Sequence, residues 1–340
     1  MNPPARPPER CLRLFWIALY LLAALCPLVV GVVRPGITGH PPAMLPDMIH
    51  GRAHQPFVKR QLVPLIVRAG LAVTPQSLDD CLRSAFERSS IARHLRWPAA
   101  DAPEFVLTLA VMYAGMVGFM LVLRRLLVRL LTLSDTASHA VVLALAAGLP
   151  VTYAGKLYLY DFTQLLLFTA GLWLMHQRRW RLYYPVFALA CLNKETSILL
   201  AGVFACWQGR RILDRPNLPH LLAQGLLGLA ILAALAWVFR DNPGSAVEWH
   251  LKRNLSPPVT RLAELRLALL AAGTLAAVWS VRRASPFVGR GFLVTLLPLL
   301  IATLFFGYLD ELRDYYEAAP LGLALALMTF APRSVQSRPA

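Results

Sequence analysis

The sequence from 182 to 208 reads LYYPVFALACLNKETSILLAGVFACWQ, an apolar stretch that four polar residues interrupt in its middle. Lys194 and Glu195 stand in this interruption, between Asn193 and Thr196. A charged side chain near the centre of a bilayer costs several kcal/mol unless it faces a partner or a water-filled cavity. The stretch therefore predicts a site inside the membrane that is either functional or a buried ion pair.

Each apolar arm of this stretch is too short to cross a membrane alone. The arms cover 182–191 and 197–207, and at about 1.5 Å per helical residue each reaches roughly half of a ~30 Å hydrocarbon core. One continuous helix with a polar middle fits these lengths, and so do two short helices that enter the membrane and return. Arginines precede the first arm at 178–181 and follow the second at 210–215, so the positive-inside rule favours a re-entrant hairpin, 182–208, with both ends in the cytoplasm.

Composition indicates a membrane protein rather than a soluble one. The 340 residues are 57% hydrophobic and 15% charged, with a mean hydropathy of +0.54. The net charge is +16, but most basic residues are arginines in short clusters between apolar runs, a pattern that marks membrane topology. We therefore expect the lipid bilayer as a partner and no nucleic acid. The five cysteines show no spacing typical of a disulfide or a zinc site.

Apolar runs along the chain predict an all-α integral membrane protein with about eight transmembrane helices plus the half-membrane hairpin. The expected spans are 14–33, 105–123, 139–153, 161–176, 218–239, 267–281, 291–309 and 318–332. Cytoplasmic tails, 1–13 and 333–340, flank a single membrane domain, 14–332. The charge pattern predicts a multi-pass protein of the plasma (inner) membrane with both termini in the cytoplasm. The longest polar stretch, 34–104, forms an outer-face loop with two amphipathic helices that lie on the membrane surface.

The outer loop carries the first candidates for chemistry. Asp47 is a lone acid that could act as a general base on an acceptor hydroxyl, although a solvated loop residue is an equal alternative. His50 and His54 could join Asp47 around a divalent metal, or they are simply polar loop residues. Lys59 and Arg60 could clamp a phosphate or anchor an interfacial helix to lipid headgroups.

The hairpin and the last outer turn carry the remaining candidates. Lys194 and Glu195 are adjacent, so on a helix they point in different directions and do not satisfy each other. We expect Lys194 to meet Asp161 or a ligand phosphate, and Glu195 to meet Arg313 in the acidic turn 307–317. A buried ion pair that only holds the hairpin together is the structural alternative.

An outer-loop acid after the first span, a surface helix behind it and a short hairpin with the polar tip ALACLNKETSILL are found together here. This arrangement resembles the polytopic C-type (GT-C) glycosyltransferase superfamily over about the first two-thirds of the chain. The resemblance implies transfer of a sugar from a polyprenyl-phosphate carrier to an acceptor on the outer (periplasmic or lumenal) face. It implies Asp47 as the catalytic residue and leaves a divalent metal open, with His50 and His54 as candidate ligands. The expected substrate contacts are Lys59, Arg60, Asp161, Lys194, Glu195, Lys252 and Arg313.

Two other classes of protein fit the same features. A transporter or flippase of a lipid-linked or anionic substrate also has a broken helix near the midplane. A non-catalytic subunit of a membrane complex is consistent with the short chain. Convergence of Asp47, Lys194 and Arg313 in one outward-opening cavity would favour the enzyme, a cavity that reaches both faces would favour the transporter, and a filled core would favour the subunit.

Overall fold

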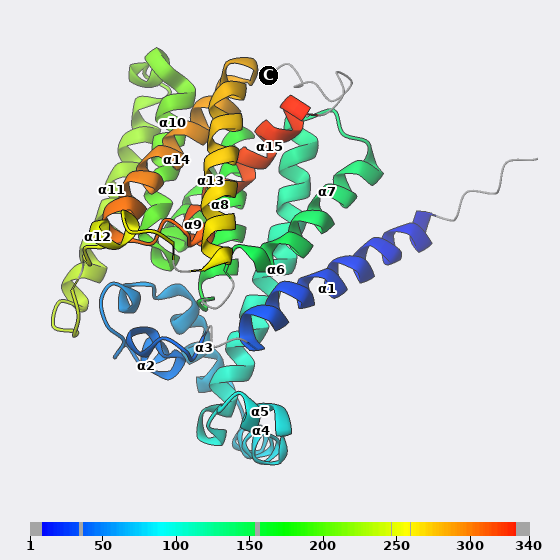
Figure 1. Cartoon of the computed structure of the whole chain (residues 1–340), viewed down its shortest axis with the longest axis vertical. Helices are drawn as coiled ribbons and strands as arrows, with labels where there is room; N and C mark the ends of the chain where they lie inside the picture. Colours follow the sequence, from blue (N-terminus) through cyan, green and yellow to red (C-terminus); the bar gives the residue numbers. More distant parts are fainter. Residues whose placement is uncertain (1–8, 34–36, 154–156, 246, 259, 331–340) are drawn as a thin grey trace, which may run out of the picture.

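The computed structural model describes residues 9–33, 37–153, 157–245, 247–258 and 260–330. Within these ranges the chain forms α-helices and short 3₁₀ helices, with no β-strand, so the prediction of an all-α protein is confirmed (Figure 1). The predicted C-terminal tail, 333–340, and residues 1–8 of the N-terminal tail lie outside the described residues.

The described residues contain fifteen α-helices of very different lengths. The long ones are α1 (Glu9–Val33), α6 (Ala102–Leu130), α11 (Leu218–Val238), α13 (Arg261–Ser280) and α14 (Pro286–Phe306). The medium ones are α3 (Leu62–Val73), α4 (Gln76–Arg88), α7 (Asp135–Gly148), α8 (Asp161–His176), α9 (Trp180–Asn193), α10 (Leu199–Gln208) and α15 (Ala319–Phe330). The single-turn ones are α2 (Leu45–Ile49), α5 (Ser90–His94) and α12 (Leu251–Asn254). The 3₁₀ helices next to the candidate site are Phe57–Lys59, Glu195–Ile198 and Leu312–Tyr315.

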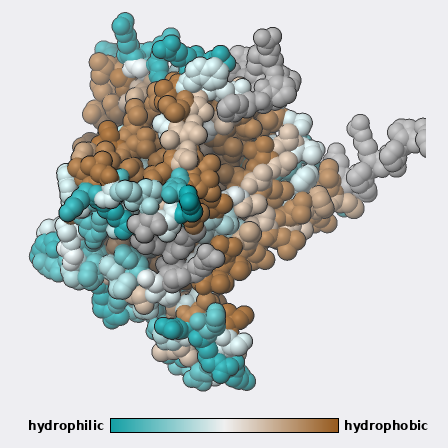
Figure 2. All heavy atoms as spheres, in the orientation of Figure 1, coloured by the Kyte–Doolittle hydropathy of each residue, from teal (hydrophilic) through white to brown (hydrophobic). Residues whose placement is uncertain are grey.

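Five helices in the described part are long and apolar enough to cross a membrane. They cover Arg10–Val33, Ala99–Leu130, Leu218–Val238, Arg261–Arg283 and Pro286–Phe306. A helix of about 20 residues spans a ~30 Å hydrocarbon core, and each of these meets that length. The other three predicted spans correspond to α7, α8 and α15, which are shorter. The described residues therefore have the helices of a multi-pass membrane protein, and Figure 2 shows a broad hydrophobic surface between hydrophilic ends.

Helices α6 and α8 form the centre of the bundle, with α1 and α7 on one side and α9, α10 and α14 on the other. The close approach of α6 to α8 depends on Gly115, because a Cβ there would lie 3.2 Å from the backbone nitrogen of Thr163. Phe119 of α6 and Phe162 and Phe168 of α8 are fully or almost fully buried. Helices in a membrane associate through van der Waals packing, because lipid tails are as apolar as these side chains, so a close approach at a small residue matters more than burial itself.

The stretch 182–208 forms a helical hairpin, and the alternative of one continuous helix is wrong. Helix α9 ends at Asn193, and the chain is extended at Lys194 (φ −158°, ψ 137°) before it continues into α10. Trp180 at the start of α9 packs edge-to-face against Phe204 near the end of α10, with ring centroids 5.3 Å apart. The two ends of the hairpin therefore lie together, and its polar tip lies at the opposite end.

The ends of the bundle differ in chemistry. The arginine-rich ends of the hairpin lie beside the start of α14, where His176 contacts Phe287 at a centroid distance of 4.7 Å. The hairpin tip lies instead beside the C-terminal ends of α11 and α14. The two predicted amphipathic segments of the outer loop are α3 and α4, and α4 lies with α5 beyond the bundle at the start of α6.

Candidate functional site

A cavity of about 510 Å³ lies at the hairpin-tip end of the bundle. Its floor is ionic and comes from the segment before α3, the hairpin tip and the turn between α14 and α15. One wall is apolar and comes from Leu232, Leu235 and Ala236 of α11 and from Leu299, Ala302 and Phe306 of α14. The cavity therefore joins charged groups to a hydrocarbon surface.

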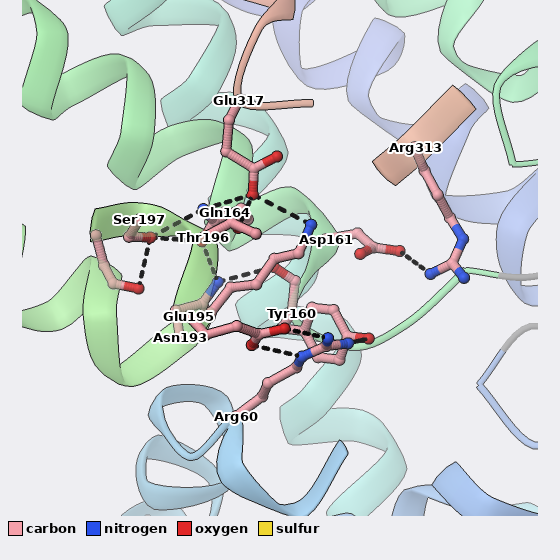
Figure 3. Close-up of polar contacts among 12 residues, drawn as sticks. Arg60, Tyr160, Asp161, Gln164, Asn193, Glu195, Thr196, Ser197, Arg313 and Glu317 are labelled. Atoms are coloured by element: carbon pink, nitrogen blue, oxygen red, sulfur yellow. Dashed lines mark hydrogen bonds and ion pairs between the residues drawn. The ribbon is translucent and has the colours of Figure 1, made fainter. Parts of the chain in front are cut away.

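Glu195 at the hairpin tip pairs with Arg60, which lies just before α3 (Figure 3). The guanidinium donates from Nη2 to Oε1 at 2.7 Å and from Nε to Oε2 at 3.2 Å, which is the bidentate geometry of strong arginine–carboxylate pairs. Arg60 also donates to the hydroxyl of Tyr160 and lies over its ring, 4.5 Å from the centroid. The segment between α1 and α6 is thus fixed to the hairpin.

Lys194 pairs with Glu317, at 3.1 Å between Nζ and Oε1. Glu317 is fully buried and its Oε1 also accepts hydrogen bonds from Thr196 Oγ1 and from Gln164 Nε2. The expected pairing of Lys194 with Asp161 is therefore wrong. The physical reason is position, because Glu317, two residues before α15, lies directly against the hairpin tip.

Arg313 pairs with Glu311 and lies 3.6 Å from Asp161. Its guanidinium also lies 4.2 Å from the ring centroid of Tyr158. The expected pairing of Glu195 with Arg313 is wrong, because each of these side chains has a nearer partner of opposite charge. Asp161 is buried, and it accepts a hydrogen bond from the backbone nitrogen of Tyr158 at 2.8 Å.

A buried polar network supports the hairpin tip from below. Asn193 donates to Gln164 Oε1 at 3.0 Å and accepts from Thr163 at 2.8 Å, and Gln164 donates to Ser197 at 2.9 Å. These bonds satisfy polar groups that would each cost about 1–3 kcal/mol if buried without a partner. Gln164 was not among the residues that the sequence pointed to, whereas Glu317 belongs to the acidic turn 307–317, whose crowded charges suggested a packed network. In the sequence, each of these two buried residues is recognisable as a polar residue inside, or at the edge of, an apolar run.

The structure places the predicted catalytic residue, Asp47, outside the cavity. Asp47 belongs to α2 and lies beside Arg52, with 3.4 Å between Arg52 Nε and Asp47 Oδ1. His50 contacts Glu104 at 2.8 Å, and His54 is exposed. No group of three or more potential metal ligands occurs among the described side chains, so a metal trio is not supported there.

Of the predicted substrate-binding residues, five line the cavity and two do not. Those that line it are Lys59, Arg60, Lys194, Glu195 and Arg313. Asp161 lies behind Arg313, and Lys252 lines a separate surface hollow beside Trp249 and Arg253. The structure thus brings together residues that are more than 250 positions apart in the chain.

Four cations and four carboxylates line the cavity within the described ranges. The cations are Lys59, Arg60, Lys194 and Arg313, and the carboxylates are Glu195, Glu248, Glu311 and Asp314. Lys59 is the one of these cations for which the described part of the chain provides no carboxylate partner. A negatively charged ligand can therefore approach Lys59 without displacing an internal ion pair.

No protein-family model, curated protein or solved structure matches this chain.

Proposed function

We propose that the chain is a membrane glycosyltransferase that moves a sugar from a polyprenyl-phosphate carrier to an acceptor on the outer face of the membrane. The observation that carries this proposal is the cavity that joins an ionic floor to an apolar wall. A lipid-linked sugar likewise has a polar part and an apolar part, because a charged phosphate and a sugar stand at one end of a long hydrocarbon chain. Ligand sites of this kind combine mostly apolar walls with a few placed polar groups.

Lys59 is the residue that we assign to the phosphate. It lies on the cavity floor next to Arg60, whose guanidinium is already held by Glu195. A phosphodiester placed there meets one unpaired ammonium and the edge of a paired guanidinium. Phosphates are bound by lysine as a point charge and by arginine through its planar fork.

The proposed topology has eight crossings plus the re-entrant hairpin, with both termini in the cytoplasm and the cavity on the outer face of the plasma membrane. The arginine clusters that flank the hairpin lie at the end of the bundle opposite the cavity. Positive residues are retained on the cytoplasmic side, which supports an outward-facing cavity. Every described residue of the cavity lies at that one end, which supports an enzyme over a transporter with a path to both faces.

The experiment that tests this function uses purified full-length protein in lipid nanodiscs. The probes are radiolabelled polyprenyl-phosphate-linked hexose and pentose, and the readouts are sugar transfer to octyl glycosides and release of free sugar. We expect turnover by the wild type and at least tenfold weaker donor binding by Lys59→Gln. Lys252→Gln is the matched control, because Lys252 lies outside the cavity. Absence of both turnover and donor binding would refute the proposal, as would equal donor binding by the two lysine variants.

A further inference from the structure

The carboxylates of the cavity differ in whether they have a basic partner. Glu195 pairs with Arg60, Glu248 lies 3.1 Å from His250, and Glu311 pairs with Arg313. Asp314 has no hydrogen-bond or ion-pair partner for its carboxylate anywhere in the described ranges. Three of the four acids are therefore engaged in holding the cavity together, and Asp314 is left to contact a ligand.

We infer that Asp314 is the general base that accepts the proton of the acceptor hydroxyl. This inference rests on the proposed glycosyltransferase function and gives it a catalytic residue that differs from Asp47. Asp314 lies in the turn between α14 and α15 and lines the same cavity as Lys59, whereas Asp47 lies outside that cavity. A general base must come within hydrogen-bonding reach of the proton that it removes, and only a residue of the cavity meets that requirement.

The surroundings of Asp314 suit this role electrostatically. Burial raises the pKa of Asp314 to about 6, while Arg313 opposes the rise and Glu311 adds to it. A base is most effective when its pKa lies close to the working pH, because it is then both deprotonated and able to hold a proton. The charged groups that act on Asp314 from its own turn and from the elements packed against it are Arg313, Glu311, Lys194, Asp161 and Arg60.

The proposed step conserves atoms and charge. The acceptor hydroxyl loses its proton to the Asp314 carboxylate, and the oxygen forms a bond to C1 of the sugar. The bond between C1 and the phosphate oxygen breaks, and its electron pair leaves on the polyprenyl phosphate. The leaving group gains one negative charge, which Lys59 is placed to stabilise.

The test compares three carboxylate variants in the nanodisc assay with the same labelled donors. Asp314→Asn keeps the shape of the side chain and removes the base, and loss of a general base typically lowers the rate by about 10²–10⁴. Asp310→Asn is the matched control, since Asp310 belongs to the same turn but lines the separate surface hollow. We expect its rate to equal that of the wild type. Asp47→Asn tests the base that the sequence predicted.

Binding and pH readouts separate catalysis from structure. Asp314→Asn should bind the phosphodiester donor at least as tightly as the wild type, because a negative charge has been removed from the cavity. The wild-type kcat/KM should fall as the pH decreases through about 6, and Asp314→Glu should restore part of the rate lost in Asp314→Asn. Thermal unfolding of each variant shows whether it is folded.

Two results would overturn the inference while leaving the proposed function in place. The first is a wild-type rate for folded Asp314→Asn. The second is a rate loss confined to Asp47→Asn. Failure of the wild type both to bind and to turn over the donors would overturn the proposed function itself, and the inference with it.

Discussion

The pair formed by Lys194 and Glu317 should dominate the stability of the hairpin, and a double-mutant cycle measures its contribution. The side chains are 8% and 0% exposed, and 3.1 Å separates Nζ from Oε1. Removal of one member of a buried pair costs about 3–5 kcal/mol, because the other charge stays buried without compensation. The loss of stability caused by Glu317→Gln should lie near the lower limit of this range, since the new amide oxygen can still accept hydrogen bonds from Thr196 and Gln164.

Lys194→Met keeps the length of the side chain and leaves the Glu317 carboxylate with two neutral donors. We expect the double variant to lose less than the sum of the single losses, by about 0.5–3 kcal/mol, which is the usual coupling between contacting residues. The assay is fluorescence-monitored unfolding of the detergent-solubilised protein by increasing fractions of denaturing detergent. The pair formed by Arg261 and Glu264 is a matched control without measurable coupling, because its side chains are 96% and 47% exposed.

Additive losses in the Lys194 and Glu317 variants would refute this reasoning, as would two single variants with wild-type stability. Either result would mean that the hairpin is held mainly by the neutral network around Asn193 and Gln164.

Three other predictions follow from the same structure. Because its pKa is raised to about 6, Asp314 is protonated below that pH and loses its negative charge. A phosphodiester does not titrate in this range, so its binding should tighten as the pH falls. Asp314→Asn should remove this pH dependence of binding. Single cysteines at Arg179 and Arg211 should react with a membrane-impermeant thiol reagent from the same side, and labelling from opposite sides would exclude the hairpin topology. Gly115→Leu should destabilise the protein by about 1–3 kcal/mol, because the added side chain meets the backbone of α8. Gly148→Ala is the control and should be tolerated, since no atom lies within 4 Å of its new Cβ. Equal melting temperatures of the two variants would contradict the close-packing argument.

Much of the helical architecture follows from local patterns. The apolar arms on either side of Lys194 and Glu195 predict two short helices, and α9 and α10 confirm them. Apolar length also identifies the five longest helices, because crossing a hydrocarbon core requires about 20 apolar residues wherever they occur in the chain. The shorter helices α7, α8 and α15 have the predicted positions, but their length alone does not decide whether they cross.

The partners of the charged residues could not be predicted in the same way. Arg60 lies 135 positions before Glu195, and the sequence offers Arg313 as an equally suitable cation. Which cation is nearer depends on how the segment between α1 and α6 folds over the hairpin tip, and that is a property of tertiary packing. Asp47 shows the same limit, since its place in the sequence does not reveal how the segment between α1 and α6 folds, and α2 lies outside the cavity.

The contact between the hairpin tip and the last helix also has a consequence for biosynthesis. Thr196, which follows the buried Lys194 by two residues, precedes its partner Glu317 by 121 residues. At about 5–20 residues per second, a ribosome needs roughly 6–24 s to synthesise that interval. During this time Lys194 has no Glu317 to neutralise it, so the nascent hairpin cannot adopt its final packing before the C-terminal helix emerges. A chain that terminates before Glu317 should therefore be recognised as incomplete by membrane proteases, even though every described α-helix except α15 has already been made.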